Sequence, residues 1–388
     1  KRPAHFEVDY HPEALVVLPV RGADETLADC VHALVQQSYT NFRVRVIFDS
    51  PTDPGWEIVE QVLGRYPAAP VEMMQLAEAR PTCSLKCSAV FEATADLGDA
   101  EIVAFIDSDI APDTNWLAEL VAPLANPEVV VSHGNRWYLP ADDGWGSLVR
   151  YFWNAAAVAT MYFWGMPWGG TLAVKRELLE ETDIRQRWLR AGCEDVPLGS
   201  VARSAGKKVC FVPGLIMRDR EAISLKGCFP FLDRQLLWAR LYHPLCWWAS
   251  NVWQVIIAGA MSVALLCIVV GIWQGNFAAV AVGLLAAALP NLVSMVLVSW
   301  MEKTLLPGVQ GPISRSPLRA LVAIAMTNIA MLRVVFVSLL TRSIEWRGIT
   351  YRIAGPWQVK MAAYRPYEPS LQGPAEPEPK PTEVSATV

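Results

Sequence analysis

The stretch that decides the fold is Ile102-Val103-Ala104-Phe105-Ile106-Asp107-Ser108-Asp109, in which five apolar residues lead directly into two acids. The apolar run has the length and the branched side chains of a buried strand. The acids therefore follow the carboxyl end of a core strand, where ligands bind in open α/β sheets. Because Asp107 and Asp109 are one residue apart, they project into the same crevice and repel each other unless a cation lies between them. Hard oxygen ligands of this kind suit Mg²⁺ or Mn²⁺, which usually bridge to a substrate's phosphates.

An Asp-x-Asp triplet arises by chance about once in a chain of this length, so the interpretation depends on its surroundings. Residues 14 to about 215 alternate strand and helix signals. Strands are expected at 14–18 (closed by Pro19), 42–48, 71–76, 102–106 and 129–132, and helices at 26–37, 58–63, 84–97 and 113–124. This βαβα order predicts an α/β fold with a parallel, doubly wound sheet.

Charged residues make up 18% of the chain, and they are unevenly distributed. No Asp, Glu, Lys or Arg occurs between Arg240 and Glu302, which is long enough for two membrane crossings of about 20 residues each. We expect crossings at 247–273 and 277–300, joined by a turn at Gly275-Asn276. The net charge of −5 argues against a general nucleic-acid binder, which would need a basic stripe.

A third apolar stretch, 318–340, is interrupted by Asn328 and Arg333 and has basic residues on both sides. The positive-inside rule therefore gives it no clear orientation. It either crosses the membrane or lies in the interface with Arg333 facing protein.

The eight cysteines show no Cys-x-x-Cys spacing, which favours buried reduced thiols in a cytosolic, reducing environment. The start of the chain shows no cleavable signal peptide, and the presence of a membrane helix upstream of Lys1 stays open.

The stretch 151–170 carries no charge and is rich in aromatic residues. It is either a buried core helix that ends in a Gly-rich turn, or a partly exposed apolar helix that lies against the bilayer, where Trp and Tyr are favoured.

Four further positions have side chains suited to chemistry, and each also has an ordinary structural interpretation. Asp49 ends the second strand and is either a nucleoside ligand or a turn residue, and Lys86 at a helix start either binds phosphate or is a surface lysine. Asp195 is either a general base or a helix N-cap. Arg234 and Trp238 share one helix face and either bind phosphate and stack or anchor the chain at the interface.

Taken in order, these pieces resemble the processive and lipid-directed members of glycosyltransferase family 2. The family signature is an Asp after the second strand, Asp-x-Asp, Glu-Asp or a lone Asp, and then (Gln/Arg)-x-x-Arg-Trp. The chain has Asp49, Asp107-Ser-Asp109, Glu194-Asp195 and Arg234-Gln-Leu-Leu-Trp238, and the opening Leu18-Pro19-Val20-Arg21-Gly22 resembles the first nucleotide-binding turn.

Within the family the chain looks most similar to ceramide glucosyltransferases. Val131-Ser132-His133-Gly134 resembles their Val-His-Gly segment, and Lys86 and Arg234 are also of that kind. One departure is clear, because Leu237 stands where the family usually has Arg, so pyrophosphate binding cannot be carried over to that position. Arg234 or Arg240 could substitute for it.

The resemblance implies a glycosyltransferase A-type (Rossmann-like) doubly wound mixed sheet, followed by transmembrane helices. It implies an inverting, metal-dependent transfer of a hexose from a UDP-sugar to a lipid hydroxyl, ceramide-like or another membrane alcohol. Asp195 would be the base, Asp109 and Asp107 the ligands of Mg²⁺ or Mn²⁺. The donor would contact Arg21, Asp49, Lys86, Asp107, Arg234 and Trp238, and the acceptor region would contain His133, Trp164, Trp168 and Glu194.

The expected organisation places a catalytic domain at 1–240, with its core at about 14–215 and interfacial helices at 216–244, on the cytosolic face of a membrane, typically a bacterial inner membrane. A membrane region of two to three helices follows at 245–342, then a juxtamembrane segment at 343–363 and a disordered Pro/Glu-rich tail at 364–388. Two alternatives stay open: a processive polysaccharide synthase, and a catalytically inactive membrane protein that binds sugar nucleotides.

Overall fold

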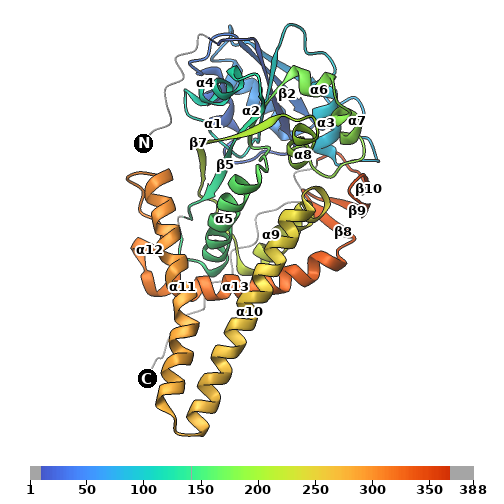
Figure 1. Cartoon of the computed structure of the whole chain (residues 1–388). Coiled ribbons are helices and arrows are strands. Elements are labelled where there is room, and N and C mark those ends of the chain that lie inside the picture. The colour runs from blue at the N-terminus through green and yellow to red at the C-terminus, as the bar shows by residue number, and fades with distance from the viewer. Residues whose placement is uncertain (1–9, 141, 368–388) are drawn as a thin grey trace, which may run out of the picture.

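The computed structural model describes residues 10–140 and 142–367, which form an α/β domain above a group of apolar helices (Figure 1). The central sheet has seven strands in the order β3-β2-β1-β4-β6-β5-β7. Their bounds are β1 Ala14–Val20, β2 Phe42–Phe48, β3 Val71–Gln75, β4 Ile102–Ile106, β5 Val129–Tyr138, β6 Thr171–Lys175 and β7 Lys208–Asp219. Strands β3, β2, β1 and β4 are parallel neighbours, as the βαβα pattern predicts.

The remaining part of the sheet makes it mixed, which confirms the fold that the resemblance implied and corrects the purely parallel prediction. Strand β6 runs antiparallel to both β4 and β5, whereas β5 and β7 are parallel. Strand β6 was not predicted, because its five residues follow the aromatic stretch without a turn signal other than Gly169-Gly170. Strand β1 also continues through Pro19: beyond Val17 it pairs only with β2, so the missing N–H of Pro19 breaks no bond toward β4.

Helices cover both faces of the sheet, and two apolar cores fill the space between them. The helices are α1 Leu27–Val35, α2 Pro54–Leu63, α3 Leu85–Ala93, α4 Trp116–Val121 with a 3₁₀ turn at Ala122–Ala125, α6 Arg176–Glu180, α7 Ile184–Trp188 and α8 Val196–Ser204. Strand β4 is fully buried along its length, so Asp107 and Asp109 do follow a core strand, as predicted.

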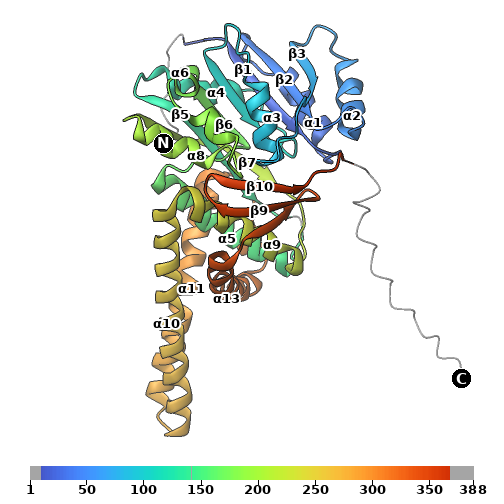
Figure 2. The same cartoon turned by 90° about the vertical axis from the view of Figure 1, so that its right-hand side faces the viewer.

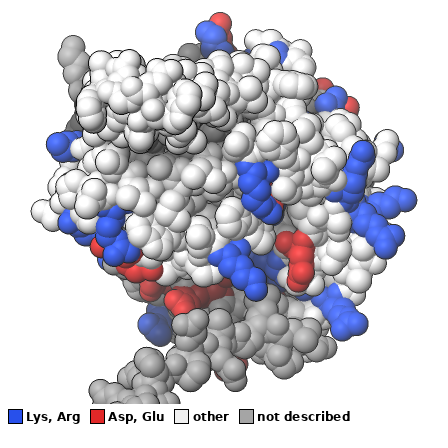
Figure 3. Space-filling view, turned by 90° about the horizontal axis from the view of Figure 1, so that it is seen from below, with Lys and Arg blue, Asp and Glu red and all other residues white. Residues whose placement is uncertain are grey.

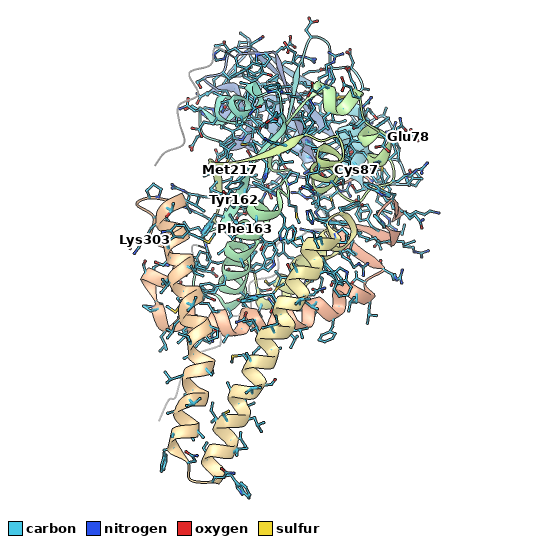
Figure 4. The ribbon with its side chains drawn as sticks, viewed as in Figure 1. Glu78, Cys87, Tyr162, Phe163, Met217 and Lys303 are labelled. Carbon is cyan, nitrogen blue, oxygen red and sulfur yellow. The ribbon has the colours of Figure 1, made fainter. Side chains whose placement is uncertain are left out.

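Helix α5 (Trp145–Trp164) combines the two interpretations of the aromatic stretch. It begins six residues earlier than expected and ends at Gly165, which adopts the left-handed conformation (φ 57°) typical of a helix C-terminus. Its first half is buried in the protein, whereas Tyr162 and Phe163 near its end are 56% and 80% exposed (Figure 4). The helix is therefore part of the core and also presents aromatic side chains at its end.

Within the described residues, three helices are long and apolar enough to cross a membrane: α10 Pro244–Trp273, α11 Phe277–Leu305 and α13 Pro317–Leu340. Helices α10 and α11 form a long hairpin that projects from the domain and turns at Gly275-Asn276, as predicted (Figure 2). At about 1.5 Å per residue each is longer than the roughly 30 Å apolar core of a bilayer. In each of these two helices, only 11% of the residues in the apolar 18-residue stretch are buried within the protein.

Helix α13 is different, because it lies across the base of the domain at a steep angle to the hairpin (Figures 1 and 2). It packs on α5 and on α9 (Leu225–Tyr242), and 44% of the residues in its apolar 18-residue stretch are buried. Arg333 donates to Asp233 of α9, at 2.7 Å between Nη1 and Oδ1. Arg333 therefore faces protein, whereas the position of this helix relative to a bilayer stays a prediction.

The segment 343–363 folds into a small antiparallel sheet, which the sequence analysis did not predict. Its strands are β8 Ser343–Trp346, β9 Ile349–Gly355 and β10 Gln358–Ala363, and a short helix α12 (Pro312–Arg315) precedes α13. Ile349, Tyr351 and Ile353 of β9 are buried against the core of the α/β domain. The predicted disorder of the tail concerns mainly residues 368–388, which lie outside the described residues.

Candidate active site

A cavity of about 710 Å³ opens at the carboxyl ends of the central strands and continues between the apolar helices. Its upper wall is polar and includes the side chains that follow β1, β2 and β4. Its lower wall is formed by residues of α5, α9, α10, α11 and α13, among them Ala159, Trp253, Leu297, Ile324 and Met331. One continuous space thus joins a charged end to an apolar end.

Eleven of the twelve predicted site residues line this cavity: Arg21, Asp49, Lys86, Asp107, Asp109, Trp164, Trp168, Glu194, Asp195, Arg234 and Trp238. The structure therefore brings together positions that are spread over more than 200 residues of sequence. His133 is the exception. It is fully buried within β5, with its ring against Phe211, and burial lowers its pKa to about 4. The structure gives no support to His133 in the acceptor region, because its ring belongs to the sheet and does not line the cavity.

The two aspartates after β4 are held by cations. Arg136 makes a two-pronged contact with Asp109, at 2.6 Å and 3.0 Å, and its Nη2 lies 3.6 Å from Asp107. Although burial raises the pKa of Asp109, the Arg136 guanidinium outweighs that effect and holds the carboxyl below its usual range. The Asp109 side chain keeps 34% of its surface exposed, so it is still accessible beside Arg136.

Lys86 links the same acidic pair to Glu194. Its Nζ lies 2.6 Å from an oxygen of Asp107 and 2.6 Å from an oxygen of Glu194. Burial alone would lower the pKa of Lys86, but the neighbouring carboxylates raise it, so the ammonium is charged. Burial raises the pKa of Glu194 to about 7 in spite of Lys86. Lys86 therefore points into the cavity and is not a solvated surface lysine.

The structure confirms the N-cap interpretation of Asp195, whereas its role as a general base stays a prediction. Asp195 is the N-cap of α8, where one carboxylate oxygen accepts from Val196 N at 2.7 Å and the other accepts from Gly169 N at 2.8 Å. It also lines the cavity. A Cβ on Gly169 would collide with the carboxylate of Glu194, so this turn needs glycine to let both acids approach. Two backbone N–H groups thus fix the Asp195 carboxylate at the cavity wall.

At the opposite side of the charged end, Arg21 forms an ion pair with Asp49. The Tyr364 hydroxyl donates to Asp49 Oδ1 at 3.0 Å. Asp49 is buried, with 6% of its surface exposed, so it is a cavity-wall carboxylate rather than a simple turn residue. Tyr364 comes from the end of the described chain, more than 300 residues away in sequence.

The final motif lies on α9. Arg234 and Trp238 both line the cavity, and the Arg234 guanidinium carbon lies 5.2 Å from the ring centre of Trp346. Trp238 packs against Gly192, where a Cβ would collide with its ring. Leu237 is fully buried in the main core and does not line the cavity.

Two cations of the cavity were missed by the sequence analysis, Arg136 and Arg347. Arg136 lies in the part of β5 that extends past the predicted end at Ser132 and pairs only with β7. The sequence could have indicated Arg136, because it follows the apolar run of the predicted strand after only a few residues. Arg347 lies in the turn between β8 and β9, and nothing in the local sequence indicates that this turn reaches the cavity.

Among the residues that the structure describes, no group of three or more His, Cys, Asp or Glu side chains is arranged to hold a metal ion. The binding of Mg²⁺ or Mn²⁺ by Asp107 and Asp109 therefore stays a prediction.

Comparison with known proteins gives the family. Residues 1–357 match the model of glycosyl transferase family 21, so the chain belongs to that family. It is a glycosyltransferase, and the coarser resemblance to family 2 is refined accordingly. No curated protein matches the sequence.

Among solved structures, the chain is similar to the mannosyltransferase PcManGT from Pyrobaculum calidifontis, which was determined in complex with GDP-Man and Mn²⁺. The identity is 17% and the TM-score 0.50, over 86% of this chain and 87% of that one. GalNAc-T7 with UDP, GalNAc and Mn²⁺ matches at 15% identity and a TM-score of 0.39, over 56% of this chain and 44% of that one. The glucosyl-3-phosphoglycerate synthase of M. tuberculosis matches at 19% identity and a TM-score of 0.34, over 55% and 73%. The similarity to PcManGT supports the glycosyltransferase A-type fold.

Proposed function

We propose that this member of family 21 transfers a hexose from a UDP-sugar to the hydroxyl group of a membrane lipid, ceramide-like or another membrane alcohol. The observation that carries the proposal is the single cavity that joins the charged residues after β1, β2 and β4 to an apolar wall built from the candidate membrane helices. A charged donor fits one end of this space and an alkyl chain fits the other.

The position of the helices supports a membrane acceptor. Seen from the side of the α10–α11 hairpin, the surface is largely uncharged, and the charged side chains on it are mainly Lys and Arg (Figure 3). Trp248 and Trp253, near the start of α10, and Trp273 near its end are exposed, as expected for rings at the two interfaces of a bilayer. The α/β domain would then lie on the cytosolic face, typically of a bacterial inner membrane, in agreement with the eight free cysteines.

On the donor side, Asp49 and Arg21 would hold the nucleoside, and Lys86, Arg136 and Arg234 would face the diphosphate. PcManGT and GalNAc-T7 carry nucleotide ligands together with Mn²⁺. In this chain Asp107 and Asp109 would hold Mg²⁺ or Mn²⁺, with water and the donor phosphates as the other ligands. Two hard carboxylates, both partly exposed, fit such an ion once Arg136 releases Asp109. The ion would stabilise the negative charge of the leaving diphosphate.

On the acceptor side, Asp195 would remove the proton from the lipid hydroxyl. The hydroxyl oxygen then forms a bond to the anomeric carbon while the bond from that carbon to the diphosphate oxygen breaks, which inverts the anomeric centre. Two backbone N–H bonds fix the orientation of the carboxylate that accepts the proton. Lys86, Arg136 and Arg234 remain close to the departing charge.

The acceptor class is tested by lipid mass spectrometry of cells that express the chain, since this reports the sugar mass and the acceptor together. We expect a new hexosyl lipid that is absent from cells carrying the Asp195→Asn variant. A soluble or polymeric product without a lipid would contradict the proposal.

A pair of neighbouring variants on α11 tests the cavity itself. Leu297 lines the apolar wall and Val296 does not, although the two residues are similarly exposed, at 54% and 68%. A Trp side chain at Leu297 would occupy space that the lipid needs, and a loss of about 1.4 kcal/mol corresponds to about tenfold in binding. We expect Leu297→Trp to raise the KM for the lipid about tenfold without changing the KM for the donor, and Val296→Trp to change neither. Equal effects of the two variants on the KM for the lipid would show that the acceptor does not bind in this cavity.

A further inference from the structure

The donor site lacks one arginine that the resemblance leads us to expect. Leu237 occupies that position and is fully buried in the core. Arg240, the next basic residue on α9, donates to the carbonyl oxygens of Leu339 (2.8 Å) and Thr341 (3.2 Å) at the end of α13. It therefore anchors α13, and it is not among the described residues that line the cavity.

An arginine from outside the α/β domain lines the cavity instead. Arg347 and Gly348 form the two-residue turn between β8 and β9, and both have positive φ angles, 47° and 73°. Turns of this type favour Asn, Asp or Gly at both positions. Among the described residues, Arg347 is the one non-glycine residue with positive φ, and that conformation costs about 1–2 kcal/mol. Strain of this kind concentrates at functional sites.

The contacts of Arg347 place its guanidinium at the charged end. Its Nη1 donates to the carbonyl oxygen of Arg21 at 2.7 Å, and its Nη2 donates to Asp24 Oδ2 at 2.9 Å. In return, Arg21 Nε donates to the carbonyl oxygen of Arg347 at 3.1 Å. These bonds connect the turn to the segment after β1, which also carries the Arg21–Asp49 ion pair.

The same residue lines the cavity together with the acidic pair, Asp107 and Asp109. The Arg347 side chain remains 34% exposed while lining the cavity, so it has surface left for a ligand. A donor with its base at Asp49 and its metal-bound phosphate at Asp109 would pass Arg347 with its diphosphate.

We infer that Arg347 binds the diphosphate of the donor and supplies the positive charge that Leu237 cannot. The inference rests on the proposed function, because it takes a sugar nucleotide as the ligand. An arginine fork matches phosphate oxygens geometrically, and a charge-assisted hydrogen bond contributes more than a neutral one.

The test uses the full chain in detergent with UDP and uridine as probes. Arg347→Gly removes the guanidinium and gives the turn a Gly-Gly sequence, which suits its backbone. Arg352→Ala is the matched control, because Arg352 is an exposed arginine of the same hairpin. We expect Arg347→Gly to weaken UDP about 10- to 100-fold and to leave uridine within about twofold, with Arg347→Lys in between. Arg352→Ala should leave both unchanged.

Three results would separate the possibilities. Unchanged UDP affinity in Arg347→Gly would overturn the inference while leaving the proposed function intact. An equal loss for UDP and uridine would also overturn it, because Arg347 would then only latch the small sheet onto the domain. Failure of the unaltered chain to bind UDP would overturn the proposed function and this assignment with it.

Discussion

The assignment of the base can be tested at two neighbouring acids, Glu194 and Asp195. Asp195→Asn keeps the size of the side chain but replaces one oxygen with an NH₂ group. Since both carboxylate oxygens accept backbone N–H bonds, one of the two donors, Gly169 N or Val196 N, loses its acceptor. An unmade bond of this kind costs about 1–3 kcal/mol, so we expect Tm to fall by several degrees. Loss of a general base should lower kcat by about 10²–10⁴-fold, a far larger effect than the loss of stability.

The matched variant is Glu194→Gln. Glu194 is 2% exposed and its carboxylate is paired with Lys86, so its geometry suits the positioning of the Lys86 ammonium. We expect this change to act mainly through the KM for the donor. Release of UDP and formation of glycolipid are measured at saturating donor, with UDP affinity and Tm determined on the same samples. A kcat for Asp195→Asn within threefold of the unaltered chain would refute the assignment, and a loss of kcat only in Glu194→Gln would transfer the role to Glu194.

Three further outcomes follow from the structure. Asp109→Ala should remove the activation of turnover by Mn²⁺ while the chain still folds, because Arg136 keeps Asp219 as a partner at 3.0 Å. Metal titration of UDP release, with Tm as the control for folding, measures this effect. Full activity of the unaltered chain without divalent ions would refute the metal role of Asp109. The pKa of buried His133 is lowered to about 4 from 6.5, so its contribution to stability is present above about pH 6.5 and is lost as the pH falls toward 4. That difference corresponds to roughly 3 kcal/mol, and His133→Leu should flatten the dependence of Tm on pH over this window. Finally, the chain should remain with membranes after washing with salt and carbonate and be extracted only by detergent; recovery in the soluble fraction would contradict the membrane spans.

The parts of the fold that the sequence predicted are those with local signals. Strand β4 was predicted from a continuous apolar run, the α10–α11 hairpin from a long stretch without charged residues, and β2 from the alternation of apolar residues with Arg43 and Arg45. Strand β6 and the extension of β5 depend on pairing with distant partners, and a pairing between segments about 40 to 80 residues apart leaves no local pattern. The same is true of the β8–β10 sheet, whose buried face is defined by contact with the α/β domain.

The residues of the candidate site can likewise be divided into those with a local sequence signal and those without one. The acids and Lys86 follow strands or begin helices within the α/β pattern, so the direction of the chain indicates where they meet. Arg136 and Arg347 reach the cavity only because tertiary pairing brings them there. The role of His133 was inferred from a motif alone, and the alternation of the strand places its ring in the core instead.

The arrangement of charges around the acidic pair has a consequence for the order of events. Arg136 occupies both oxygens of Asp109, and it also contacts Asp219 and lies over the ring of Trp168. A divalent ion that binds Asp109 has to displace this guanidinium, which is favourable only when the arginine gains another anionic partner. The diphosphate of the donor would be such a partner, since it would bring the ion and replace the carboxylate at the same moment. Metal and donor should therefore bind cooperatively, with each weak in the absence of the other, and Trp168 and Asp219 would guide Arg136 between its two positions.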